Sequence, residues 1–330
     1  MEAASLFCFA NRDKYKIEEV FESRPGWKDT IIVFTRNKGA VVSLFILLIM
    51  IVLAVFGPSF NKYTYDAIEL ERQNLPPRIP LLENVGIFDG TLSGKNMYEI
   101  KGFGDQYFWF GTDNLGRDLF TRFCCGTRIS LLIGAISALL NILVGVVYGL
   151  ISGYYGGKLD IVMQRAIEVL NGIPNLVIVS LLVIVLKPGM ISIIIAMAIS
   201  QWTGTARLVR ANTLRIKEAE HIMASRTLGT GTINILFKEI FPNLLSSVIV
   251  MAMMSVPGAI FMEAFLSFVG LGIPNPEASL GSLINDGYQC MLLYPYQLAI
   301  PAIFFAILML SLNIIGDGLR DALDPSQKQA

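Results

Sequence analysis

The side chains best suited to polar chemistry gather in residues 218–243, EAEHIMASRTLGTGTINILFKEIFPN, between two strongly apolar stretches. The first half predicts a short helix that ends at Gly229, and Thr232 is an expected N-cap for a second helix over 233–241. Charged and apolar residues are mixed in both helices, which suits docking into a groove of a soluble partner. A solvated loop without a partner fits this pattern equally well. The charged residues of the stretch are Glu218, Glu220, Arg226, Lys238 and Glu239.

Catalytic chemistry has few candidates in the rest of the chain. His221 is the single histidine, which is too few for a histidine metal site, and no serine, histidine and carboxylate constellation is visible. The four cysteines show no CxxC spacing, so we expect neither a metal nor a redox site. The chain also lacks the G-x-x-x-x-G-K-[ST] motif and is not expected to bind ATP through a P-loop. We therefore expect no enzyme and no cofactor on this chain.

Glu263 is the charged residue placed deepest in an apolar stretch. A charge within a membrane span is costly and is by default a functional hypothesis. Glu263 could contact a transported substrate or belong to a structural hydrogen-bonded network. We favour the network. Arg165 and Glu168 are three residues apart at the edge of another apolar stretch and predict a local ion pair.

The composition places these groups in a membrane protein. The 330 residues are 54% hydrophobic and only 16% charged, against about 25% charged in soluble domains. The net charge is zero, so nothing indicates nucleic-acid binding. A spanning helix needs about 20 mostly apolar residues. Six stretches meet this length and predict an all-α polytopic membrane protein, namely 39–61, 129–157, 166–186, 188–206, 244–271 and 287–316.

The distribution of basic residues predicts the topology. Residues 1–38 hold seven lysines and arginines, so the positive-inside rule places the N-terminus in the cytoplasm, and six crossings return the C-terminus there. Residues 207–243 then form a cytoplasmic loop, and residues 317–330 a cytoplasmic tail. Residues 27–34 predict an amphipathic helix on the inner membrane surface. Residues 62–128 lie outside, where six aromatic residues from Tyr98 to Phe110 indicate a small ordered subdomain.

Glycine and proline positions indicate how the spans pack. Gly145, Gly149 and Gly153 are one turn apart, and such a stripe lets helices approach closely in lipid. We favour helix packing over a substrate contact for this stripe. Pro174, Pro257 and Pro301 interrupt three spans and predict kinks, which membrane helices tolerate beside a partner helix or a wet cavity.

The charged loop resembles the cytoplasmic signature of ABC importer permeases, which reads E-A-A, three residues, G, and later L-P-N. In this chain the signature falls on Met223-Ala224-Ser225, on Gly229 and on Phe241-Pro242-Asn243. Met replaces the family's Glu, Ser replaces its second Ala, and Phe replaces its Leu. These departures put a salt bridge at Met223 in doubt, with apolar packing in its place, but leave the glycine and the spacing to Pro-Asn.

Five further segments resemble the dipeptide and oligopeptide permease subfamily. They follow one another in order over residues 110–325, and the chain is most similar to the C-type permease subunit of these importers. The segments are FGTDNLGRD at 110–118, GYYGG at 153–157, ARLVR at 206–210, EAFLSFVGLG at 263–272 and GDGLRDALDP at 316–325.

The resemblance implies the type I ABC importer permease fold, with six transmembrane helices and an extracellular subdomain between the first two. It implies a sister permease subunit, two ABC ATPase subunits that hold ATP and Mg, and an extracytoplasmic peptide-binding protein. The chain would work in a bacterial plasma membrane by alternating access, surrounded by lipid, with a peptide as substrate. The implied ATPase-docking residues are Glu218, Glu220, His221, Met223, Ala224, Ser225, Gly229, Pro242 and Asn243.

Three other functions remain open from the sequence. Nickel and glutathione permeases are similar, although the long segment 62–128 favours an oligopeptide system. A self-sufficient secondary transporter would show inverted repeats and intramembrane charged pairs, and we find no convincing repeat and only Glu263 deep in a span. A membrane enzyme is the weakest alternative, because catalytic groups are lacking.

Overall fold

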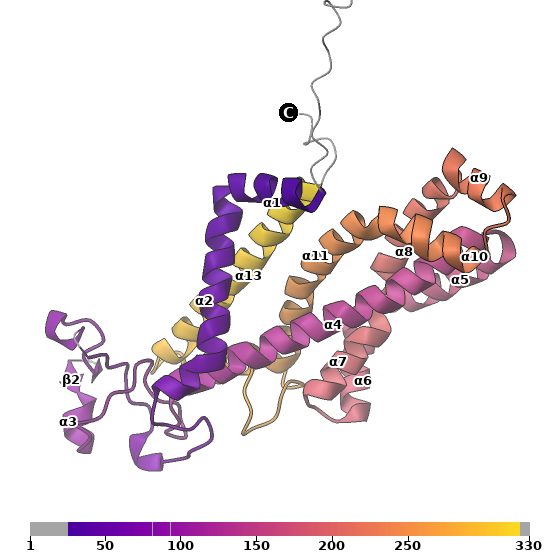
Figure 1. The fold of residues 1–330 in the computed structure, drawn as a ribbon. Coiled ribbons are helices and arrows are strands. Elements are labelled where there is room, and N and C mark those ends of the chain that lie inside the picture. Colours follow the sequence, from indigo (N-terminus) through magenta and orange to yellow (C-terminus); the bar gives the residue numbers. More distant parts are fainter. Residues whose placement is uncertain (1–25, 81, 93, 324–330) are drawn as a thin grey trace, which may run out of the picture.

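The computed structural model describes residues 26–80, 82–92 and 94–323, and helices dominate it (Figure 1). Two helices begin the described chain, α1 (Gly26–Arg36) and α2 (Lys38–Phe60). A mostly irregular segment follows, with η2 (Leu70–Arg72), η3 (Glu83–Val85), the antiparallel strands β1 (Thr91–Leu92) and β2 (Lys95–Asn96), and α3 (Met97–Lys101). The remaining elements are α4 (Leu119–Tyr155), α5 (Gly157–Asn171), α6 (Asn175–Leu186), α7 (Met190–Ser200), α8 (Thr203–Ile216), α9 (Glu220–Thr227), α10 (Thr232–Asn234), η4 (Ile235–Ile240), α11 (Phe241–Phe268), α12 (Leu280–Cys290) and α13 (Tyr296–Leu323).

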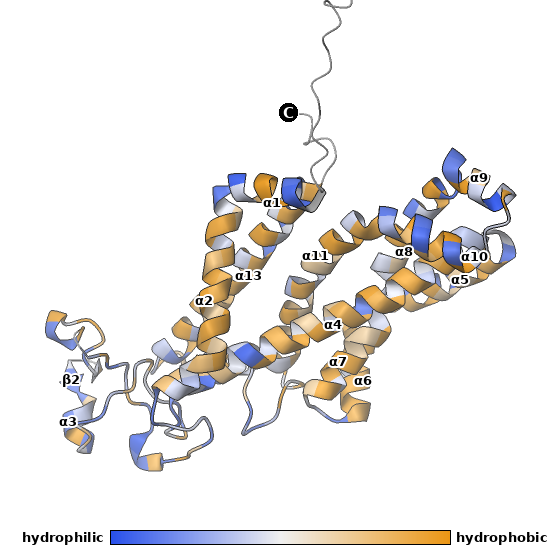
Figure 2. Ribbon diagram, viewed as in Figure 1, coloured by the Kyte–Doolittle hydropathy of each residue, from blue (hydrophilic) through white to orange (hydrophobic). Residues whose placement is uncertain are grey.

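The long helices are apolar over most of their surface, as the orange ribbons of Figure 2 show for α2 and α4. Within the described residues, four helical segments are long and apolar enough to cross a membrane. They are Lys38–Phe60, Leu119–Tyr155, Thr232–Phe268 and Tyr296–Leu323, and between 22% and 44% of their most apolar windows is buried within the chain. The exposed apolar side chains need lipid or another protein around them, so this is a multi-pass membrane protein.

The expected number of six continuous spans is not reproduced. The stretch 166–186 is divided between α5 and α6, which are bent by 78°; counting this pair as one span raises the total among the described residues to at most five. Pro174 precedes α6 and cannot donate the backbone hydrogen bond that would continue α5. The stretch 188–206 is divided between α7 and α8 at Gln201 and Trp202, and α7 alone is about 16 Å long, too short for a hydrocarbon core of about 30 Å.

Other boundaries shift with local capping. We expected the second span to begin near residue 129, whereas α4 begins at Leu119 because the Asp118 side chain accepts the Thr121 backbone N–H. We expected the last span over 287–316; its first residues belong to α12, and α13 begins at Tyr296 and continues to Leu323, so part of the predicted tail is helical. The helix predicted over 27–34 is confirmed as α1, and the ion pair between Arg165 and Glu168 is confirmed at 2.5 Å. Residues 1–25 and 324–330, with most of the N-terminal basic residues, lie outside the described residues.

The glycine stripe of α4 packs directly against α8, as predicted. A Cβ at Gly145 would lie 2.6 Å from the Thr205 Cβ, and one at Gly149 would lie 2.6 Å from the Ala206 carbonyl oxygen. A Cβ at Gly153 would lie 2.7 Å from the Thr213 Cβ. The two helices can approach this closely only where α4 has no side chains.

Gly149→Ala is therefore expected to destabilise the chain by about 1 to 3 kcal/mol, because the added methyl forces two packed backbones apart. Thermal unfolding of the purified chain in detergent measures the change. Gly258→Ala is the matched control, since nothing lies within 4 Å of a Cβ at that position of α11, and alanine there improves helix propensity. Equal loss of stability in both variants would argue against close packing at Gly149.

The segment between α2 and α4 forms the expected ordered subdomain. Leu75, Tyr98 and Phe108 are at most 1% exposed, and the Tyr98 hydroxyl donates a hydrogen bond of 2.8 Å to the Pro76 carbonyl. Arg78 pairs with Glu83 at 2.8 Å, and this hydrogen bond holds the pKa of the Glu83 carboxyl below its usual value.

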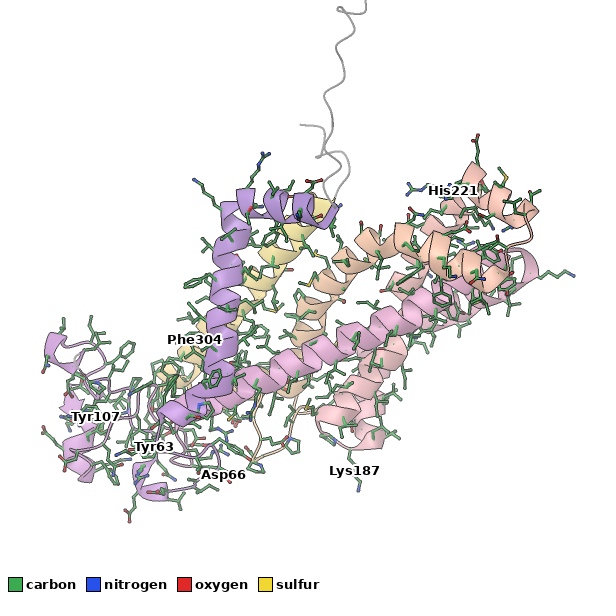
Figure 3. All side chains as sticks on the ribbon, in the orientation of Figure 1. Tyr63, Asp66, Tyr107, Lys187, His221 and Phe304 are labelled. Carbon is green, nitrogen blue, oxygen red and sulfur yellow. The ribbon has the colours of Figure 1, made fainter. Side chains whose placement is uncertain are left out.

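Two of the aromatic residues predicted for this core instead join the subdomain to the spanning helices. Trp109 packs 4.7 Å from the Phe120 ring of α4, and Phe110 packs 5.6 Å from the Phe304 ring of α13. Figure 3 marks Phe304 on α13, away from Tyr107 in the subdomain.

Candidate functional site: the loop between α8 and α11

The charged loop lies at one end of the molecule. Figure 3 places His221, on α9, at this end. Lys187, between α6 and α7, and Tyr63 of the subdomain lie at the opposite end. Figure 1 shows α1 on the same side as α9. The loop and the subdomain are thus separated by the full height of the apolar helices.

The inner side of the loop is anchored in an apolar cluster. Ile222, Ile235 and Ile240 are at most 1% exposed, and they pack with Leu150 of α4 and Val209 of α8. Burying side chains of this size typically contributes about 1.5 to 3 kcal/mol each. The loop is therefore held firmly to α4 and α8.

The outer side of the loop presents apolar side chains to the surroundings. Met223 is 51% exposed, Leu228 86%, Ile233 72% and Phe237 57%. A concentration of exposed apolar side chains beside charged residues is typical of a protein-interaction surface. The predicted docking residues lie mostly on this side: Glu218, Glu220, His221, Met223, Ala224, Gly229, Pro242 and Asn243 are exposed, and Ser225 is half-buried.

Gly229 forms the turn that ends α9. Its φ of +80° lies in the left-handed region that favours glycine, and nothing lies within 4 Å of a Cβ built there. The turn is closed by hydrogen bonds from Gly229 N–H to the Arg226 carbonyl and from Thr230 N–H to the Ser225 carbonyl, both of 3.1 Å. A substitution at Gly229 would strain the backbone without creating a steric clash.

The second predicted helix differs from expectation in both its start and its type. Thr232 is the first residue of α10 and not its N-cap; Gly231 precedes it and offers no side chain for capping. Residues Ile235–Ile240 then form a π-helical segment, η4, instead of an α-helix. π-Helical segments are rare and frequent at functional sites.

Pro242 and Asn243 account for part of this irregular geometry. Pro242 has no N–H, so the Lys238 carbonyl cannot receive the usual hydrogen bond from four residues ahead. The Phe241 N–H bonds to the Leu236 carbonyl, five residues back, and the Asn243 side-chain amide donates to the Glu239 carbonyl at 2.6 Å. The Pro-Asn pair of the signature thus sits where the loop joins α11.

Beneath the loop, polar groups tie three helices together. Arg210 of α8 donates two hydrogen bonds to the Asp160 carboxylate of α5, from Nε at 2.6 Å and from Nη2 at 2.5 Å. Ser152 of α4 donates to the same carboxylate at 2.5 Å, and Lys217 donates to the Gly153 carbonyl at 2.9 Å. Bidentate arginine–carboxylate pairs are among the stronger polar contacts, so α4, α5 and α8 are joined at the base of the loop.

Glu263 is fully buried within α11. Its carboxylate accepts hydrogen bonds from Ser130 of α4 at 2.9 Å and from Ser267 at 2.7 Å. The Ser130 hydroxyl also accepts the Leu280 N–H at the start of α12. This geometry is a hydrogen-bonded network joining three helices, and the described residues enclose the Glu263 side chain completely.

A second polar cluster lies where the subdomain meets α4. Arg117 pairs with Asp113 at 2.6 Å with both side chains at most 4% exposed, and Arg122 lies 3.6 Å from the same carboxylate. Arg117 also donates to the Asn275 side chain at 3.0 Å, and Arg122 lies 3.8 Å from Asp286 of α12. Burial raises the pKa of the Asp286 carboxyl. The cluster therefore connects the subdomain, α4 and the segment before α13.

The fold and the loop together define a multi-pass membrane protein, with apolar helices, a subdomain at one end and an anchored, outwardly apolar loop at the other. A family model described as "Binding-protein-dependent transport system inner membrane component" matches residues 145–329, and one described as "N-terminal TM domain of oligopeptide transport permease C" matches residues 26–77. The chain belongs to this family of ABC importer permeases, within the branch of the oligopeptide and dipeptide C subunits.

Individual relatives cover almost the whole chain. The oligopeptide transport system permease protein OppC of Bacillus subtilis (strain 168) is 42% identical over 92% of this chain and 90% of its own length. The dipeptide transport system permease protein DppC of the same organism is 42% identical over 89% and 84%. The glutathione transport system permease protein GsiD of Pectobacterium atrosepticum is 38% identical over 67% and 73%. A solved structure of the MetNI methionine ABC transporter in an inward-facing conformation aligns with a TM-score of 0.49 at 18% identity, over 62% of this chain and 96% of that chain.

Proposed function

We propose that this chain is the permease subunit of an ATP-driven importer that takes up oligopeptides or dipeptides. The observation that carries the transport role is the loop between α8 and α11, which is anchored on its inner side and apolar on its outer side. Peptide cargo is supported by the relatives, because the oligopeptide and dipeptide permeases match more of this chain, at higher identity, than the glutathione permease does.

The proposed complex contains a sister permease, two ATPases that bind ATP and Mg, and an extracytoplasmic peptide-binding protein. The exposed side chains around Met223 and Leu228 would enter a groove on one ATPase. A movement of the ATPase would then reach α4 and α8 through the buried isoleucines, and α11 through η4. Closure of the ATPase pair would open the pathway outward to the docked binding protein, and hydrolysis would reopen it inward.

The proposed orientation places the loop, α1 and both termini in the cytoplasm. The basic residues before α2 support this orientation through the positive-inside rule. The positions of α1 and α9 on one side, and of Lys187 and the subdomain on the other, are consistent with it (Figure 3). The membrane is then the plasma membrane of a bacterium, with the subdomain facing the binding protein.

Purification of the chain from its native membrane in mild detergent tests this proposal. We expect two P-loop ATPases and a second permease to copurify, as identified by mass spectrometry. The reconstituted complex should take up peptide in an ATP-dependent manner, and nickel or free glutathione should not compete. A chain that purifies alone and transports without ATP would instead be a secondary transporter.

A further inference from the structure

Two broken helices of this chain meet at a group of uncharged polar side chains, which we call the polar junction: Asn141, Asn171, Gln201 and Thr203. The Asn141 side chain donates a hydrogen bond of 3.3 Å to Gln201, and the Thr203 hydroxyl donates one of 3.0 Å to Asn171. Asn171 ends α5 just before the bend into α6, and Gln201 and Thr203 lie on either side of the break between α7 and α8.

The polar junction lies deep in the apolar layer. Asn141 is near the middle of the uncharged stretch 129–157 and is 2% exposed. Breaks in membrane helices expose backbone polar groups, which are tolerated at this depth only inside protein or along a wet path. In secondary transporters, discontinuous helices near the middle of the bilayer commonly form substrate sites, and the same arrangement of broken helices and polar side chains occurs here.

One acceptor in the junction has no partner. The Asn141 Oδ1 atom is buried and receives no hydrogen bond in the described part of the chain. Leaving such a group unpaired costs about 1 to 3 kcal/mol. Gln201 is half-buried, so it is the member of the pair that a solute can reach, and displacing it would open the way to Asn141.

The chemistry of the junction selects the kind of ligand. Its side chains offer hydrogen-bond donors and acceptors but no charge, so an ion entering the apolar layer would find no counter-charge here. A side-chain amide carries one carbonyl and one NH₂, which complements the donor and acceptor of a peptide group. Such contacts recognise the backbone of a peptide and do not depend on which side chains it carries.

We propose that the polar junction binds the backbone of the transported peptide, with a cargo N–H donating to Asn141 Oδ1 and Gln201 making the neighbouring contact. This inference rests on the proposed function, because it needs peptide as cargo. It assigns the site at which the permease binds the peptide. It also explains how one permease could transport peptides with different side chains.

The test uses the complete importer in liposomes with two cargo peptides. One is unmodified, and the other carries backbone N-methyl groups that remove N–H donors. The pair is chosen so that the binding protein holds both with equal affinity. We expect the native complex to take up the N-methylated peptide about tenfold more slowly, the effect of losing one buried hydrogen bond of about 1.4 kcal/mol.

Asn141→Leu should lower uptake of the unmodified peptide about tenfold and leave uptake of the N-methylated peptide unchanged. Gln201→Met is a second variant on the other side of the same hydrogen bond and should show the same pattern. Asn313→Leu is the matched control, because the Asn313 amide bonds to the Met309 carbonyl of its own helix at 2.8 Å. This control should keep uptake of both peptides within twofold.

Other results would overturn the inference. If Asn141→Leu lowered uptake of both peptides equally, Asn141 would have a structural role. If uptake of both peptides were unchanged, Asn141 would not contact the cargo. A photoreactive residue at position 201 that labels the sister permease instead of the cargo would assign the junction to the subunit interface. Failure of the proposed function is distinguishable, since the native complex would then hydrolyse ATP without taking up either peptide.

Discussion

Arg117→Met should lower the free energy of unfolding of the purified chain by about 3 kcal/mol. The Arg117 and Asp113 side chains are 3% and 4% exposed and lie 2.6 Å apart. Removing one partner of a buried pair leaves an uncompensated charge, which typically costs about 3 to 5 kcal/mol. We expect the lower end of this range of free energies, because Arg122 remains 3.6 Å from Asp113 and partly compensates its charge. Thermal unfolding in detergent, followed by intrinsic tryptophan fluorescence, measures the loss.

Arg165→Met is the matched control for this prediction. Arg165 and Glu168 also form a close pair, at 2.5 Å, but their side chains are 75% and 51% exposed. Exposed pairs contribute about 0 to 1 kcal/mol, so this variant should unfold near the temperature of the native chain. If both variants lost the same stability, burial of the Asp113 pair would not explain the effect.

Gly229→Asp should abolish most ATP-driven peptide uptake while the chain still inserts into the membrane. The φ of +80° at Gly229 would force an L-residue into the left-handed region, at a cost of about 1 to 2 kcal/mol. The turn between α9 and α10 would relax into another conformation and displace Met223 and Leu228 from the ATPase groove proposed for them. We expect uptake to fall more than tenfold in reconstituted liposomes, with ATP hydrolysis no longer stimulated by the loaded binding protein.

Gly231→Asp separates backbone strain from the added charge. Gly231 lies in the same loop with a φ of −64°, and nothing lies within 4 Å of its Cβ position. Aspartate is also favourable there as the residue before α10. Uptake close to that of the native complex in this variant would assign the effect at Gly229 to its conformation. Normal peptide uptake by the Gly229→Asp complex would show that this turn is not needed to couple ATP hydrolysis to transport.

Local patterns in the sequence predicted several features correctly. The mixture of polar and apolar residues over 27–34 predicted the helix seen as α1, glycines four residues apart predicted close helix packing along α4, and the spacing of Arg165 and Glu168 predicted their ion pair. Each of these depends on residues within a few turns of one helix.

Features that depend on the path of the backbone could not be predicted in the same way. Hydropathy averages over about 20 residues and does not detect the 78° bend after α5, although Pro174 indicated a kink. The Asp160–Arg210 pair joins residues 50 positions apart, and no spacing rule connects them. The π-helical form of η4 also needed the structure, because Pro242 signals an interruption without specifying its type.

α4 is one continuous helix that connects the loop end of the molecule to the subdomain end. Its 37 residues correspond to a rod about 55 Å long. Arg122, which lies close to Asp113, is near one end, and Ser152, which contacts Asp160, is near the other. A tilt of about 5° in such a rod would move one end relative to the other by about 5 Å. A small rotation imposed at the loop end of α4 would thereby displace the subdomain end by several ångströms, without any change in the helix itself.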